Sequence, residues 1–245
     1  MRKFSDYSLL LLKGMGMGAA DVVPGVSGGT IAFITGIYEE LVNSIKSLNL
    51  EALKLLLRLK TGLFWKKING NFLLLVFGGI LLSVFSLARL LKWLMTDHPV
   101  LIWSFFFGLI IASAIVVLKK INSWNLSKLA GLLAGAILMF FVTRFSPAQS
   151  TDAYWYVFLA GAIAICAMVL PGISGAFILL ILGKYQFILA AVSEFNIPVL
   201  LVFGLGVITG LLSFANLLSW LFRKCHDLTI AVLAGFIIGS LNKIW

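Results

Sequence analysis

Long apolar runs without a charged residue alternate with short polar segments along most of this chain. The charge-free runs cover residues 68–88, 99–118, 153–183 and 195–222. Each approaches or exceeds the roughly 20 residues that an apolar helix needs to cross a bilayer. Shorter apolar runs at residues 129–143 and 228–242 are expected to span as well. The pattern predicts an all-α integral membrane protein.

Composition supports this class and argues against several others. Of the 245 residues, 61% are hydrophobic and 11% are charged, and the mean hydropathy of +1.09 is far above that of a water-facing globular chain. Cys166 and Cys225 lie far apart in no metal-type pair, and His98 and His226 are isolated. Walker, dinucleotide-binding and H-E-x-x-H motifs are absent. We therefore expect no cofactor, no metal and no redox chemistry.

Two Pro-Gly breaks interrupt the apolar sequence in the same way. The segment "DVVPGVSGGT", residues 21–30, and the segment "VLPGISGAF", residues 169–177, share the core Pro-Gly-x-Ser-Gly. Further matches follow at the same offset, and a second offset pairs Trp93 with Trp220. The chain is therefore predicted to be a duplication.

The predicted organisation is a single membrane domain over residues 1–245. Residues 7–118 form the first repeat, residues 119–152 a connecting span and residues 153–245 the second repeat. The two offsets differ because the first repeat carries an insertion within residues 43–70.

The number of predicted crossings sets the relative orientation of the repeats. The first arm, residues 7–42, reads as a helix, a break and a second helix that leave the chain on its starting side. Three spans follow, at about residues 71–94, 99–118 and 126–145. An odd number of crossings makes the repeats inverted, each with a Pro-Gly-broken re-entrant helical hairpin followed by transmembrane helices. Inverted repeats broken at matching positions indicate a transporter with its site near the bilayer midplane.

The basic residues give an independent check on this topology. A cytoplasmic N-terminus places most of them on the cytoplasmic side: Arg2, Lys3, Lys46, Lys54, Arg58, Lys60, Lys66, Lys67, Lys119, Lys120, Lys128, Arg223 and Lys224. Lys92, Arg144, Lys243 and Arg89 fall outside. This asymmetry follows the positive-inside rule, so the net charge of +10 requires no nucleic acid.

The insertion contains the segment "LEALKLLLRLKTGLFWKKI", residues 50–68. Glu51, Lys54, Arg58 and Thr61 are spaced to share one helical face, and the leucines and Trp65 occupy others. This predicts an interfacial amphipathic helix in contact with membrane lipids. A solvated loop that only fixes the topology is the alternative interpretation.

The Pro-Gly-x-Ser-Gly motifs carry the candidate chemistry. A backbone break is tolerated in a membrane only where it is buried in protein or lines a wet cavity. Proline favours the first turn of a helix, so half-helices are expected from about residue 26 to 38 and from about residue 173 to 185. Helix N-termini attract phosphate. The candidate phosphate-binding residues are Gly25, Ser27, Gly28, Gly29, Thr30, Gly172, Ser174 and Gly175. Close helix packing by small residues is the structural alternative.

Charged residues within and beside the arms add further candidates. Asp21 could orient the loop amides, hold a coupling proton or pair with a basic residue, and a cap to the neighbouring backbone is its structural alternative. Glu39 ends the first half-helix and is a second candidate for coupling. Lys184 holds a similar place in the second half and could extend to the interface. Arg89 and Arg144 could contact a phosphate or anchor the chain at the interface.

The segments "GMGMGAADVVPGVSGGTIAFITGIYEEL" and "LPGISGAFILLILGKY" resemble a bacterial membrane family linked to polyprenyl-phosphate translocation, the PopT-type transporters. The resemblance covers essentially the whole chain. It implies a multi-pass protein of the bacterial cytoplasmic membrane that returns undecaprenyl phosphate from the outer to the inner leaflet for reuse in cell-envelope and peptidoglycan synthesis. A coupling proton or cation is an open partner.

Two other functions fit parts of the pattern. Integral polyprenyl-pyrophosphate phosphatases combine inverted repeats with a Pro-Gly-x-Ser stretch, but there Arg-Ser follows and a glutamate-rich motif is added. Here Gly28 and Gly29 follow Ser27, so a phosphatase would lack charge stabilisation and a general base. The second alternative is a small-anion channel or transporter, because the same helix ends could bind a small ion.

Overall fold

The computed structural model describes residues 4–23, 26–145 and 151–243, whose regular elements are all helical. The elements of the first half are α1 (Phe4–Val22), α2 (Gly28–Ile34), α3 (Tyr38–Lys46), α4 (Leu50–Leu57), α5 (Thr61–Lys67), α6 (Gly70–Asp97) and α7 (Pro99–Leu118). They are followed by α8 (Leu126–Val142), α9 (Tyr154–Val169), α10 (Gly175–Ile181), α11 (Tyr185–Ser193), α12 (Ile197–Lys224), α13 (His226–Ser240) and a 3₁₀ turn (Leu241–Lys243).

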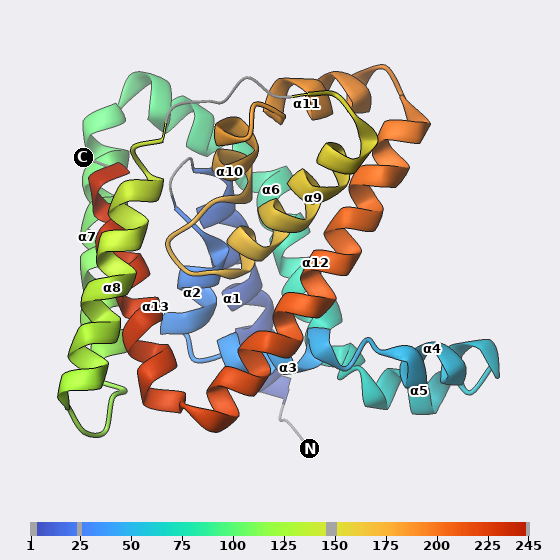
Figure 1. The fold of residues 1–245 in the computed structure, drawn as a ribbon, viewed down its shortest axis with the longest axis horizontal. Coiled ribbons are helices and arrows are strands. Elements are labelled where there is room, and N and C mark those ends of the chain that lie inside the picture. The colour runs from blue at the N-terminus through green and yellow to red at the C-terminus, as the bar shows by residue number, and fades with distance from the viewer. Residues whose placement is uncertain (1–3, 24–25, 146–150, 244–245) are drawn as a thin grey trace.

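The two halves of the chain use the same order of elements. Helices α2 and α10 have 7 residues each, α3 and α11 have 9 each, and α6 and α12 have 28 each. Helix α1 packs along α6, and α9 packs along α12 in the same way. Figure 1 shows α3 at the lower edge of the molecule and α11 at the upper edge.

Three helices in the described residues are long and apolar enough to cross a bilayer: α6, α7 and α12. The pair α10 and α11 would be a fourth such segment but bends by 111° at its break. Large apolar side chains on the outside of these helices, such as Phe105, Leu201 and Leu205, are exposed. These features are those of a multi-pass membrane protein. The shorter apolar runs form α8 and α13, with 17 and 15 residues.

Glycines bring the main helix pairs into close contact. A Cβ on Gly79 of α6 would lie 2.3 Å from the Leu11 carbonyl oxygen of α1, and one on Gly206 of α12 would lie 2.1 Å from the Phe158 oxygen of α9. Gly235 of α13 approaches Leu132 of α8 in the same way. Without a hydrophobic driving force between helices in lipid, such backbone contact is what small residues supply.

The half-helices end earlier than the sequence predicts. Helices α2 and α10 stop at Ile34 and Ile181 and do not continue to the tyrosines. Gly36 and Gly183 follow with φ of +75° and +66°, which is the left-handed conformation that terminates helices and favours glycine. A second helix, α3 or α11, then begins at Tyr38 or Tyr185 in a new direction.

The insertion forms two short helices rather than one. Leu59, with φ of +56°, separates α4 from α5, and the pair projects from the body at the lower right of Figure 1. Lys67 and Glu51 form an ion pair across it, which holds the pKa of the Glu51 carboxyl below its usual range. Leu50, Leu57 and Leu63 remain exposed.

Two adjacent glycines test the close packing of α1 and α6. We expect Gly79→Ala to lower the stability by about 1–3 kcal/mol, because its methyl group would collide with the α1 backbone. Gly78→Ala is the matched control, since its Cβ would meet no atom within 4 Å. Thermal unfolding of the purified protein in detergent measures both. Equal midpoints for the two variants would contradict this packing.

Candidate functional site

The two motif breaks, far apart in sequence, meet inside the molecule. The Ser27 hydroxyl donates a hydrogen bond to the Leu170 carbonyl oxygen at 3.2 Å. The Gly172 N–H donates to Thr30 Oγ1 at 2.9 Å. A Cβ on Gly29 would lie 2.7 Å from the Val169 carbonyl oxygen, so the two backbones touch at a glycine. The start of α2 is therefore fastened to the break between α9 and α10.

The Asp21 carboxylate lies against the first turn of α2. Its Oδ1 accepts a hydrogen bond from the Gly28 N–H at 2.7 Å. A Cβ on Gly28 would lie 2.5 Å from Oδ2, so a side chain at this position would displace the carboxylate. An acidic group at a helix N-terminus is favoured by the helix dipole. Asp21, at the end of α1, thus orients the backbone of the break that follows it.

The first motif has no free N–H groups at the residues that begin α2. Ser27 is the N-cap, and its Oγ accepts from the Gly29 N–H at 3.1 Å, while the Thr30 N–H donates to the Ser27 carbonyl oxygen. Ser27 and Thr30 are each 1% exposed. In this conformation the N–H groups of Gly28 and Gly29 are bonded to Asp21 and Ser27, so the anion cradle expected here stays a prediction that requires these bonds to exchange.

The second motif is less completely capped. Ser174 occupies the N-cap position of α10 but makes no side-chain capping hydrogen bond, and both Ser174 and Gly175 are half-buried. The residue that corresponds to Asp21 is Met168, whose Cβ would lie 3.2 Å from a Cβ on Gly175. Gly172 has φ of +86°, a conformation that favours glycine. The two motifs are therefore chemically unequal.

Two lysines to which the sequence analysis gave no role at the site lie at the other end of α2. Lys13 donates to the Thr35 carbonyl oxygen at 2.7 Å, and Lys120 donates to the Phe33 oxygen at 2.9 Å. Cations at these carbonyls complement the helix dipole. Desolvation lowers the pKa of Lys120, and the Glu39 carboxylate opposes that effect.

The corresponding end of α10 is held differently. The Tyr156 hydroxyl donates to the Leu182 carbonyl oxygen at 3.2 Å. Lys184 is only 1% exposed, pairs with Asp152 and lies 4.8 Å from the centre of the Phe187 ring. Its ammonium group is bonded to the exposed Asp152 carboxylate and lies near two aromatic rings, so a position at the interface stays a prediction.

The remaining predicted residues lie away from the meeting point of the motifs or outside the description. Glu39 pairs with His226 at 3.0 Å, which joins α3 to the start of α13. Arg144 is exposed beyond α8 and its guanidinium stacks 4.3 Å from the centre of the Phe140 ring. No contact in the described residues joins Arg144 to either motif. Gly25 and the Arg89 side chain lie outside the described residues.

Apolar cavities flank both motifs. One of about 470 Å³ lies beside Ile31 of α2 and is also lined by residues of α1, α6 and α7. Another, of about 310 Å³, lies beside Leu170 and Phe236. Their walls are almost entirely hydrocarbon side chains, which suit an apolar occupant. The polar groups of the motifs thus lie next to spaces suited to hydrocarbon.

Comparison with known proteins finds relatives over nearly the whole chain. A profile of the VCA0040-like family, described as undecaprenyl phosphate translocase-like, matches residues 17–245. A protein of Vibrio cholerae serotype O1 named polyprenyl-phosphate transporter is 50% identical over 243 residues, which is 99% of this chain and 79% of that protein. A Staphylococcus aureus protein of the same name is 33% identical over 253 residues, or 96% and 85% of the two chains. No solved structure shows a significant match.

The hydrogen bond between the two motifs can be tested with an isosteric change. We expect Thr30→Val to lower the stability by about 1–3 kcal/mol, because the buried Gly172 N–H loses its acceptor. Thr209→Val is the control, since Thr209 is exposed and bonds only within its own helix, to Leu205. Thermal unfolding in detergent compares the two. A Thr30→Val midpoint no lower than that of the control would show that this contact contributes nothing.

Proposed function

We propose that this chain, which belongs to the undecaprenyl phosphate translocase-like family, carries a polyprenyl phosphate across a membrane. The cargo we propose is undecaprenyl phosphate, moved from the outer to the inner leaflet of the bacterial cytoplasmic membrane, where envelope synthesis reuses it. The observation that carries the proposal is the contact between the two Pro-Gly-x-Ser-Gly breaks.

A phosphate group that crosses hydrocarbon needs a replacement for its water. Hydroxyls and backbone N–H groups are suitable donors, and glycine allows the phosphate to approach the backbone. In our proposal the half-exposed Ser174 and Gly175 receive the head group first. Ser27, Gly28, Gly29, Thr30 and Gly172 add donors when the two motifs separate.

The same contacts support alternating access. Two side-chain hydrogen bonds, Ser27 to Leu170 and Gly172 to Thr30, join the motifs in this conformation. A net protein hydrogen bond contributes only about 0.5–1.5 kcal/mol, so the favourable binding of a phosphate could replace both. We propose that this exchange opens the junction and lets one repeat rock against the other.

The inverted arrangement that this mechanism needs is supported by the paired elements. Helices α3 and α11 follow equivalent breaks yet lie at opposite edges in Figure 1. Inverted repeats would turn the two re-entrant breaks toward opposite faces of the membrane, which is what movement between leaflets requires. The prenyl tail would stay in lipid and in the apolar cavities beside Ile31 and Leu170.

Translocation can be measured directly with the purified chain in liposomes that carry a labelled polyprenyl phosphate. We expect the protein to speed leaflet exchange, and Ser174→Leu to slow it at least about ten-fold, because a donor to the phosphate is lost and a bulky group is added. Ser193→Leu is the control, since Ser193 is exposed at the end of α11. We vary Ser174 because Ser27 is buried and structural.

Two results would overturn the proposal. Full translocation by a folded Ser174→Leu protein would remove the proposed site. Release of inorganic phosphate from a polyprenyl pyrophosphate, without translocation, would replace the transporter by a phosphatase.

Asp21 is the residue we propose for proton coupling. Asparagine retains an oxygen acceptor for the Gly28 N–H but cannot exchange a proton, so Asp21→Asn separates charge from geometry. We expect Asp21→Asn to keep the fold and to lose the dependence of transport on pH. Transport rates across a pH series, with the unchanged chain alongside, give the comparison. An identical pH profile for the two proteins would leave Asp21 with its backbone role only.

A further inference from the structure

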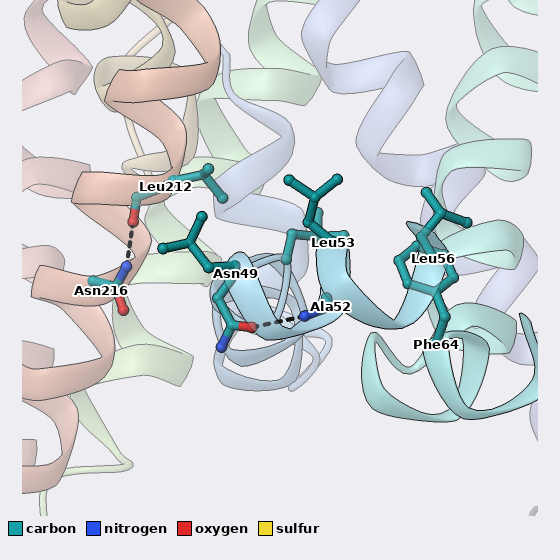
Figure 2. Close-up of a pocket in the computed structure, with 9 residues that line it drawn as sticks. Asn49, Ala52, Leu53, Leu56, Phe64, Leu212 and Asn216 are labelled. Atoms are coloured by element: carbon teal, nitrogen blue, oxygen red, sulfur yellow. Dashed lines mark hydrogen bonds between the residues drawn. The ribbon is translucent and has the colours of Figure 1, made fainter. Parts of the chain in front are cut away.

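A further apolar groove lies away from the motifs, where the inserted helices approach α12. It has a volume of about 500 Å³, with residues of α4 and α5 on one side and Leu212 and Asn216 on the other. Figure 2 shows Leu53, Leu56 and Phe64 along it. Both asparagines that line it are bonded to backbone: Asn49 accepts from the Ala52 N–H, and Asn216 donates to the Leu212 oxygen. The groove is therefore suited to a hydrocarbon chain.

Two cations converge on one hydroxyl close to this groove. Lys46 Nζ donates to Ser219 Oγ at 3.2 Å, and Arg223 donates to the same oxygen at 3.1 Å. Ser219 in turn donates to Asn43 Oδ1 at 2.8 Å and is only 2% exposed. Neither cation pairs with a carboxylate in the described part of the chain. Two positive groups held together by a neutral hydroxyl form a site with uncompensated charge.

The cations lie on the same two segments that form part of the groove wall. Asn216 and Ser219 are three residues apart on α12 and so share one face of that helix. Lys46 ends α3, two residues before Leu48 of the groove wall. A ligand with its chain in the groove would thus place its head group at Lys46 and Arg223. This surface joins α3 of the first half to α12 of the second.

We propose that this surface is a docking site for a polyprenyl monophosphate, outside the motif site and on the face that carries α4 and α5. The inference rests on the proposed function and adds a second place where the cargo is held. Two cations match a phosphomonoester, which carries close to two negative charges at neutral pH. A phospholipid diester carries one charge on its phosphate and two chains, and so matches the cation pair and the single groove less well.

Binding to the full chain in zwitterionic nanodiscs tests the proposal, with a fluorescent short-chain polyprenyl monophosphate as the probe. Using Ser174→Leu as the background removes the motif site. We expect this background to retain binding, and Lys46→Gln with Arg223→Gln to weaken it at least about ten-fold, because two charge-assisted contacts are lost. Asn216→Trp should weaken binding through the groove while it leaves both cations in place.

Two matched double variants distinguish loss of the specific site from a change in net charge and from a folding defect. Lys66→Gln with Lys119→Gln removes the same charge from exposed positions and should leave binding unchanged. Lys46→Arg with Arg223→Lys keeps the charge and should restore binding, which a folding defect would not allow.

Other outcomes have separate meanings. No binding in the Ser174→Leu background, or binding unaffected by the glutamine pair, would overturn the docking site while the transporter proposal stands. Equal competition by phosphatidylglycerol would identify the occupant as bulk anionic lipid and would also overturn it. A chain that translocates no polyprenyl phosphate in liposomes would instead remove the proposed function itself.

Discussion

The need to satisfy every backbone polar group without water governs this molecule. Where the chain breaks at residues 21–30 and 169–177, it leaves helix ends that lipid cannot solvate. Side chains of the protein satisfy most of these groups. Asp21 and Ser27 accept hydrogen bonds from the N–H groups at the start of α2, and Thr30 accepts one from the Gly172 N–H of the second break. The second break is thus completed in part by Ser27 and Thr30 of the first half of the chain. Binding of a polar cargo would have to exchange with these bonds.

Hydropathy and spacing predicted much of the fold. The spans expected at residues 71–94 and 99–118 correspond to α6 and α7, because a lipid-facing helix needs only a long apolar run. Helices also end before and begin after both motifs, at Val22 and Gly28 and at Val169 and Gly175, since proline and glycine act locally. The end of α2 before Gly36 was missed, although the glycine itself was the available signal. The insertion was expected to be one helix, and Leu59 divides it into two.

The site was predicted less well because its contacts join residues more than a hundred positions apart. The repeated motif identified Ser27, Thr30 and Gly172 as candidates, but not that they bond one another or the Leu170 carbonyl. The role of Lys120 depends on where α7 ends relative to α2, which no local pattern encodes. Likewise the buried Lys184 and the exposed Asp152 form an ion pair that only the folded chain brings together. The sequence indicated which side chains can form hydrogen bonds or ion pairs, whereas their actual partners depend on how the helices pack.

The two half-helices differ in the number of side-chain hydrogen bonds at their ends, and this difference affects how easily each can move. Helix α2 is held at its start by Asp21 and Ser27 and at its end by Lys13 and Lys120. Helix α10 has a side-chain donor at its end, from Tyr156, but its N-cap residue Ser174 supplies no side-chain acceptor at its start. A load applied at the junction would therefore displace α10 before α2. The two arms are alike in sequence but differ in stiffness: α2 is the rigid half-helix and α10 is the compliant one.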